Sequence, residues 1–144
     1  YLTVTLSERG SDLLVREIEA LRHAVRVTRL KRPFRIDAWV VLPDHMHCVW
    51  TLPEGDSDYA GRIGQIKAGF SKALPEGRLR ASHMLRREKG IWQRRFWEYH
   101  VRNEEDFSAC VRYCWTNPVK HGLVADLKDW PYSSWHRDGG GAVL

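Results

Sequence analysis

The spacing of apolar residues along the chain alternates between the period of a strand and the period of a helix. Residues 1–6 are rich in β-branched and aromatic types, which favours a strand. A helix is predicted from Ser11-Asp12 to about Leu30, because its apolar residues fall at i, i+4, i+7 and i+11 on one stripe. These residues are Leu14, Ile18, Leu21 and Val25. The chain therefore begins with a strand followed by an amphipathic helix that faces a sheet.

Two apolar segments joined by a turn predict a β-hairpin. Residues 34–42 become continuously apolar, as in a central strand, and residues 45–52 follow as a second strand after the turn signal Pro43-Asp44. A second helix is predicted from about Tyr59 to Leu74, with one apolar stripe. Residues 75–90 are polar, basic and without a period, which indicates a mobile loop.

The second half predicts one more strand and one more helix. Residues 91–101 suit a strand with many aromatic side chains. Asn103 is expected to cap the following helix, with Asp106 in a capping-box spacing. That helix is expected to end near Asn117, because Pro118 disfavours α geometry in the residue before it. The chain closes with Trp130-Pro131-Tyr132-Ser133-Ser134 and a glycine-rich tail.

The predicted element order is β-α-β-β-α-β with a further helix. This order predicts an α+β fold of the ferredoxin-like, split β-α-β type, with an antiparallel sheet and helices on one face. We expect a single domain over residues 1–137 and a flexible glycine-rich tail over residues 138–144. Such a fold serves enzymes and RNA-binding modules alike, so it does not assign a function.

Composition narrows the class of protein. The chain has 144 residues, a net charge of +5 and a pI of about 9.3, which favours a polyanionic partner. No apolar run approaches the ~20 residues that span a bilayer, and no secretory leader opens the sequence. Its three cysteines, Cys48, Cys110 and Cys114, show no disulfide spacing. We therefore expect a cytoplasmic protein with no membrane partner.

His45 and His47 are the first candidate site residues. Side chains at i and i+2 of a strand point to the same face, so both imidazoles project together while Met46 points to the other face. Such a pair can hold one divalent metal and leave other positions for water or substrate oxygens. Two structural histidines at a strand edge are the competing interpretation of so short a motif.

Tyr113 and Asn117 lie one helical turn apart and share a face of the last predicted helix. A phenol there can attack phosphorus if a nearby cation favours the phenolate or polarises the phosphate, and the amide oxygen can complete a metal shell. A half-buried tyrosine with an ordinary helix asparagine explains the pair equally well on these residues alone. Tyr99 and Tyr132 compete for the nucleophile role.

Four blocks in order make the sequence resemble a known family. Pro43-Asp44-His45-Met46-His47 before an apolar strand resembles the His-hydrophobic-His motif of the HUH nucleases. Residues 92–98, 113–124 and 130–134 resemble later blocks of the REP-associated tyrosine transposases, single-tyrosine relatives of bacterial insertion-sequence transposases. The likeness runs from Tyr1 to about Arg137, and the combination of blocks is highly specific.

The resemblance implies a function and a site. His45 and His47 match the family's metal-binding pair, Tyr113 matches its nucleophile, and Asn117 sits where relatives place a third polar ligand. The implied reaction is Mg²⁺- or Mn²⁺-dependent cleavage and strand transfer on single-stranded DNA, through a 5′-phosphotyrosine intermediate with a free 3′-OH. The implied substrate is a hairpin-forming palindromic repeat, bound by a monomer or a homodimer. The glycine-rich tail departs from the family pattern.

Contacts to DNA are predicted from residue type. Basic side chains favour phosphates and exposed aromatic rings favour stacking on bases. The candidates are Lys67, Lys72, Trp92, Arg94, Arg95 and Lys120, with Trp97 as the alternative aromatic. Solvated charges and core aromatics are the competing interpretation for each.

Two other functions stay open at this level. One is a domesticated module that binds repeat hairpins without turnover. The other is an RNA-binding ferredoxin-like domain, which would need exposed aromatics on its central strands. Trp39 and Trp50 are the only aromatics between residues 39 and 52.

Overall fold

The computed structural model describes residues 1–74 and 90–138. Four strands form one sheet in the order β2-β3-β1-β4, and every neighbouring pair is antiparallel. The strands are β1 (Leu2–Thr5), β2 (Arg35–Val41), β3 (His45–Thr51) and β4 (Trp97–Glu98). This order is that of the split β-α-β arrangement, so the predicted α+β, ferredoxin-like fold is confirmed.

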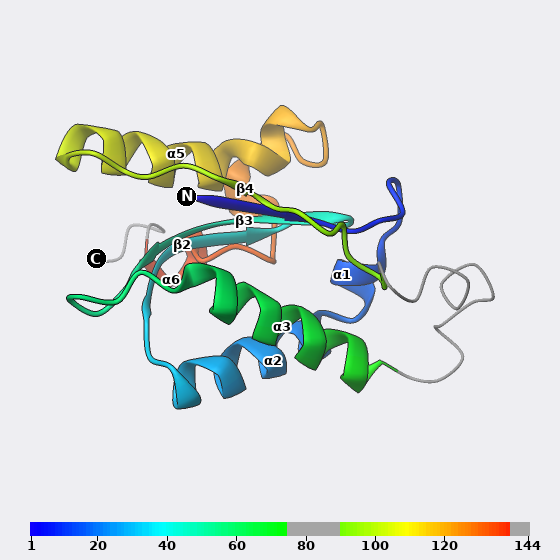
Figure 1. Ribbon diagram of the computed structural model, residues 1–144. Coiled ribbons are helices and arrows are strands. Elements are labelled where there is room, and N and C mark those ends of the chain that lie inside the picture. The colour runs from blue at the N-terminus through cyan, green and yellow to red at the C-terminus, as the bar shows by residue number, and fades with distance from the viewer. Residues whose placement is uncertain (75–89, 139–144) are drawn as a thin grey trace.

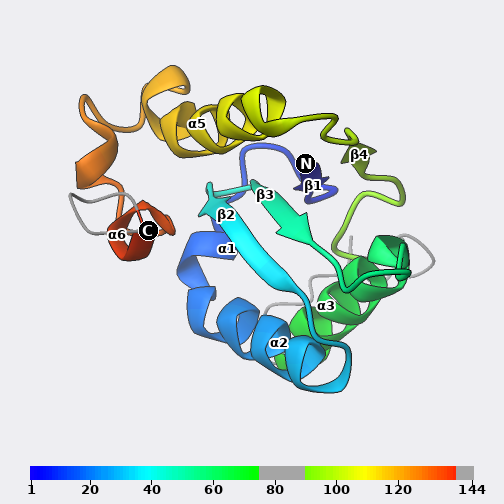
Figure 2. The ribbon, with the colours of Figure 1, turned by 90° about the vertical axis from the view of Figure 1, so that its left-hand side faces the viewer.

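Helices cover both faces of the sheet (Figure 1). On one face lie α2 (Ile18–Lys31) and α3 (Tyr59–Ala73), preceded by the short α1 (Leu13–Arg16). On the opposite face lies α5 (Glu104–Lys120), which contacts β2 and β3 (Figure 2). The prediction of helices on one face therefore holds for α2 and α3, while the additional helix α5 covers the other. Within the described part of the chain, no helix is both long and apolar enough to cross a membrane.

The alternation of β3 explains how the two faces differ. Met46 and Cys48 are buried in the core beneath α2 and α3, and Val49 is buried in a separate cluster beneath α5. Trp39 and Trp50 pack against the α2/α3 core. Since α2 and α3 pack against one face of the sheet and α5 packs against β2 and β3 on the other, these two tryptophans do not form the open aromatic face that RNA-recognition modules use.

The segment expected to be a strand over residues 91–101 forms only the two-residue β4. Ile91 and Trp92 are buried in the core, and Trp92 makes only an isolated bridge to Leu6. Residues 93–95 are exposed, so the chain leaves the sheet before it pairs again at β4. The expected loop over residues 75–90 lies outside the described residues, apart from Gly90.

The last long helix begins as predicted and ends later than predicted. The side chain of Asn103 accepts a hydrogen bond from the Asp106 amide, which confirms the N-cap. The helix then continues through Pro118 to Lys120. The side-chain amide of Asn117 donates to the Tyr113 carbonyl at 2.7 Å, whereas the carbonyl that Pro118 leaves without a backbone donor is that of Cys114, four residues earlier. Gly122, at φ 73°, is where the chain leaves the helix.

The closing block ties the end of the chain to the outer edge of β2. The Tyr132 carbonyl accepts from the Val41 amide at 2.9 Å, and the Trp130 indole donates to the Val41 carbonyl at 2.9 Å. The Ser134 hydroxyl accepts from the Trp115 indole at 3.0 Å, which links this block to α5. Two short helices, η2 (Leu127–Asp129) and α6 (Trp135–Asp138), belong to this segment. The tail was predicted over residues 138–144; Asp138 belongs to α6, and residues 139–144 lie outside the described residues.

Candidate functional site

Three histidines meet between β3 and the C-terminal end of α5. His45 and His47 project from the same side of β3, as their spacing predicted, and His121 joins them from the C-cap of α5. One ring nitrogen of each lies within 4.8 Å of the others. The ring centroids of His45 lie 4.9 Å from His47 and 5.1 Å from His121. Three imidazoles at this separation fit a single divalent transition-metal ion.

The two ring nitrogens of His47 have different surroundings. Its Nδ1 lies 2.9 Å from the Tyr1 hydroxyl and 3.0 Å from the Thr3 hydroxyl, whereas its buried Nε2 has no partner within the described residues. Burial, and then the neighbouring His45, lower the pKa of His47 to about 3. A neutral imidazole with one nitrogen held by hydroxyls and the other unpaired fits a metal ligand.

His45 is held by a carboxylate on the residue before it. Its Nδ1 lies 2.7 Å from Asp44 Oδ1, and Asp44 Oδ2 accepts from Arg9 Nε and the Gly10 amide, both at 2.9 Å. Burial alone would raise the pKa of Asp44, but hydrogen bonds from Gly10, His45 and Arg9 lower it to about 2. Asp44 is therefore an ionised acceptor that orients His45 so that Nε2 can face a metal.

Tyr113 presents an exposed phenol beside the histidines. Its side chain is 45% exposed, and its ring centroid lies 6.4 Å from that of His47. Lys120, two turns along α5, donates a 2.7 Å hydrogen bond to its hydroxyl. A positive charge on the same helix therefore lies at the phenolic oxygen of Tyr113.

The other tyrosines near or proposed for this site are less suited to attack. Burial strongly raises the pKa of the Tyr1 hydroxyl, which is already engaged by His47. The Tyr99 hydroxyl donates to Asp106 at 2.8 Å. Tyr132 packs with the α2/α3 core on the opposite face of the sheet. Among these, only Tyr113 combines exposure with a cationic partner.

Asn117 and His121 occupy the last turns of α5. Asn117 is 1% exposed, and its side-chain amide donates to the Tyr113 carbonyl. His121 follows Asn117 by four residues and was not predicted as a site residue. The signal was available, because residues 113, 117 and 121 share one helix face, but the expected helix end near Asn117 placed His121 beyond that face.

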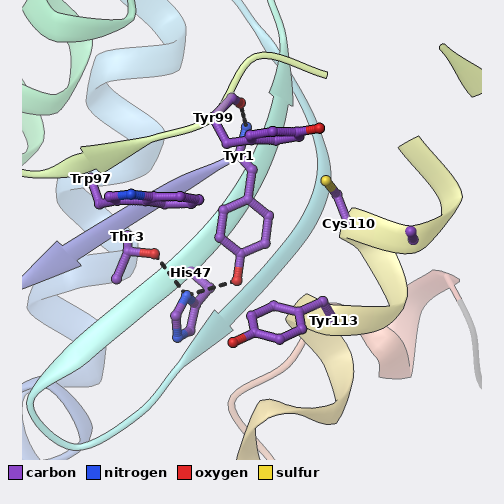
Figure 3. Close-up of a pocket in the computed structure, with 8 residues that line it drawn as sticks. Tyr1, Thr3, His47, Trp97, Tyr99, Cys110 and Tyr113 are labelled. Carbon is purple, nitrogen blue, oxygen red and sulfur yellow. Dashed lines mark hydrogen bonds between the residues drawn. The ribbon is translucent and has the colours of Figure 1, made fainter. Parts of the chain in front are cut away.

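A pocket of about 490 Å³ opens directly beside Tyr113 and His47 (Figure 3). The sheet edge contributes one wall and α5 the other, and aromatic or small side chains make up most of the lining. Besides Tyr113 and His47, the lining residues are Tyr1, Thr3, Trp97, Tyr99, Ala109 and Cys110.

The predicted DNA contacts are not gathered in one place. Lys67 and Lys72 belong to α3, across the sheet from the histidines, and Lys67 donates to the Gln93 carbonyl at 3.0 Å. Arg94 and Arg95 are exposed just before β4. Lys120 contacts the Tyr113 hydroxyl within the site.

The prediction that Trp92 stacks on a base is wrong for this conformation. Trp92 is 4% exposed and its ring packs against Phe70 in the core, with 5.5 Å between centroids. A ring buried to this extent offers no exposed face on which a base could stack. Trp97, the alternative, is 57% exposed.

Comparison with known proteins gave close relatives. No family model matches the chain. It is 47% identical over 138 residues to a REP-associated tyrosine transposase of Escherichia coli K12, covering 96% of this chain and 76% of that protein. It is 42% identical over 140 residues to a putative REP-associated tyrosine transposase of Haemophilus influenzae, covering 96% and 80%. A solved structure of a REP-associated tyrosine transposase bound to a REP hairpin matches with a TM-score of 0.85, 45% identity, and coverage of 99% and 79%.

Proposed function

The chain belongs to the family of REP-associated tyrosine transposases, and we propose that it cleaves and rejoins single-stranded DNA at hairpin-forming palindromic repeats. The observation that carries this proposal is the meeting of the Tyr113 phenol with three imidazoles at one end of α5. The solved relative bound to a REP hairpin supports the same class of substrate. The net charge of +5 is consistent with a polyanionic partner.

Tyr113 is the proposed nucleophile. The Tyr113 hydroxyl gives its proton to solvent as its oxygen attacks the scissile phosphorus, the bond from phosphorus to the 3′ oxygen breaks, and that oxygen takes up a proton from solvent and leaves as a hydroxyl. The products are a 5′-phosphotyrosine and a free 3′-OH. Attack by a 3′-OH on the phosphotyrosine reverses the exchange, so strands are rejoined without ATP because the phosphodiester energy is kept in the covalent intermediate.

Lys120 and the histidines divide the remaining work. Lys120 donates to the Tyr113 hydroxyl and stabilises negative charge on that oxygen, both when it attacks and when it leaves. His45, His47 and His121 would hold Mg²⁺ or Mn²⁺, which when bound polarises a non-bridging phosphate oxygen. Asp44, Tyr1 and Thr3 orient the first two rings. Asn117 stays a predicted additional ligand.

All five of these side chains (Tyr113, Lys120, His45, His47 and His121) come from one chain. A single protomer therefore has what the proposed chemistry needs, which supports a monomer as the active unit. A homodimer that shares sites, as in insertion-sequence relatives, is the alternative.

A covalent-adduct assay tests the proposal. A labelled single-stranded hairpin oligonucleotide with unpaired flanks is incubated with the protein and Mn²⁺, and adducts that survive denaturing electrophoresis are counted. We expect an adduct with the unaltered chain and none with Tyr113→Phe. Tyr132→Phe is the matched control and should form the adduct at the unaltered rate. Tight hairpin binding without an adduct in any divalent metal would instead favour a binding module without turnover.

A further inference from the structure

The chemistry proposed above assigns no ligand to the pocket beside Tyr113, although four of the residues that line it, Tyr1, Thr3, His47 and Tyr113, take part in that chemistry. Tyr113 and His47 line both the pocket and the catalytic cluster. A group bound in the pocket would therefore adjoin the phosphate that Tyr113 attacks. The chemical character of the pocket then indicates which part of the DNA strand it takes.

The sheet wall of the pocket is a row of side chains in register across three strands. Thr3 on β1 pairs with His47 on β3 and with Trp97 on β4, so the three side chains point to the α5 face together. Tyr1 and Tyr99 lie two residues along on the same face, joined by a hydrogen bond from the Tyr1 amine to the Tyr99 carbonyl (Figure 3). This register places an aromatic shelf at the sheet edge.

The shelf has two parallel rings and one crossed ring. The ring planes of Trp97 and Tyr99 are nearly parallel, with an interplanar angle of 5° and 6.2 Å between the ring centroids. Tyr1 meets Trp97 edge-on at 5.7 Å. Trp97 is nevertheless 57% exposed, which is unusual for the largest apolar side chain. An exposed, oriented tryptophan face is suited to a planar partner.

The opposite wall leaves room for such a partner. Of the three α5 residues that line the pocket, Ala109 and Cys110 are small, and the third is Tyr113 itself. The volume of about 490 Å³ exceeds that of any one lining side chain and suits a flat ring system entering from solvent. Arg94 and Arg95 are exposed on the segment that leads into β4, where a DNA backbone passing the shelf would meet positive charge.

We propose that this pocket binds an unpaired nucleobase next to the scissile phosphate, stacked on Trp97. The inference rests on the proposed function, because it assumes a single-stranded substrate whose cleaved phosphate lies at Tyr113. It adds a subsite that positions the strand through a base. Stacking on one aromatic ring is tolerant of base identity, so the subsite holds the strand in place more than it reads its sequence.

The test pairs protein variants with abasic DNA. The hairpin oligonucleotide is made with a single abasic site at each of several positions on either side of the cleaved phosphate, and binding is measured without divalent metal at fixed salt. The proteins are the unaltered chain, Trp97→Ala and Trp97→Phe. Leu30→Ala, at an 84% exposed apolar residue on α2, is the matched control.

Trp97→Ala should weaken binding of the intact hairpin about tenfold, whereas Trp97→Phe and the control should change it less than about threefold. One abasic position should weaken binding by the unaltered chain by a similar factor and cause no further loss with Trp97→Ala, because each change removes the same contact. The fluorescence of 2-aminopurine placed at that position should be quenched strongly by the unaltered chain, less strongly by Trp97→Phe, and not at all by Trp97→Ala. Equal unfolding temperatures exclude a folding defect at this exposed site.

Two results would overturn the inference. One is that Trp97→Ala binds the intact hairpin as tightly as the unaltered chain. The other is that, at every abasic position, the loss of binding free energy caused by the abasic site adds in full to the loss caused by Trp97→Ala. The adduct assay separates this failure from failure of the proposed function. An adduct with the unaltered chain but no coupling to Trp97 removes the subsite alone. Coupling to one base without any adduct keeps the subsite and removes the catalytic proposal.

Discussion

The ammonium group of Lys120 donates a 2.7 Å hydrogen bond to the hydroxyl of Tyr113, and it lies 4.5 Å from the centroid of the same ring. The two residues are seven apart on α5, so they lie two turns apart on one face of the helix. From the sequence, Lys120 was predicted only as a contact to DNA phosphates. In the structure it touches the proposed nucleophile, and this leads to the first prediction.

Removal of the Lys120 ammonium should slow adduct formation more than it weakens DNA binding. Lys120→Ala should lower the single-turnover rate at saturating hairpin by about a hundredfold, as loss of one charge-stabilising donor does elsewhere, with a smaller loss for Lys120→Arg. Lys128→Ala removes one exposed positive charge from η2 and is the matched control. Weaker binding with an unaltered saturating rate would instead make Lys120 a phosphate contact.

His121 should be needed for activation by metal. His121→Ala should raise the Mn²⁺ concentration for half-maximal adduct formation by tenfold or more, because it removes one of three converging imidazoles. His23→Ala, an exposed histidine on α2, serves as control. If this Mn²⁺ concentration does not change in His121→Ala but rises in Asn117→Ala, the result would favour the ligands predicted from sequence, which include Asn117 and not His121.

Asp44 should act through His45. Asp44→Asn removes the charged acceptor that orients the His45 ring, and loss of such an outer partner commonly costs about tenfold to a hundredfold in metal affinity. Isothermal titration calorimetry, with Mn²⁺ added to the protein, measures that affinity directly. Unchanged affinity in a folded Asp44→Asn protein would mean that the backbone alone holds His45.

Trp92 should matter for stability and not for DNA contact. Trp92→Ala should lower the free energy of unfolding by about 3–5 kcal/mol, because it empties a core position packed against Phe70. Chemical denaturation measures this loss, with Trp92→Phe expected to lose less. A stable Trp92→Ala protein with specifically weakened hairpin binding would restore the role predicted from sequence.

Acid should weaken the fold at Asp56. Arg62 is 1% exposed and binds both carboxylate oxygens of Asp56, at 3.0 and 2.8 Å, which lowers the pKa of that carboxyl. A folded-state pKa below the unfolded value of 3.8 means that the stabilisation is complete above about pH 4 and is lost as the pH falls further. The free energy of unfolding, measured from pH 6 to pH 2, should fall less steeply for Asp56→Asn than for the unaltered chain.

Much of the fold could be predicted because local patterns and tertiary packing agree. The hairpin over β2 and β3 and the helices α2 and α3 follow periods that each element shows by itself. The two misjudged elements are those where packing outweighs the local signal. Trp92 turns into the core and leaves β4 with two residues, and α5 continues through Pro118 to Lys120 although the proline costs one backbone hydrogen bond.

The sequence by itself determined that His45 and His47 share one face of a strand, because side chains alternate along any strand. It also pointed to Tyr113, through order and spacing within family-like blocks. Only the tertiary structure decided which groups from other elements meet these residues, since His121 and Trp97 reach the site through the docking of α5 and β4 against the sheet. Local periodicity constrains neighbours in sequence, whereas contacts across elements depend on how separate buried faces pack together.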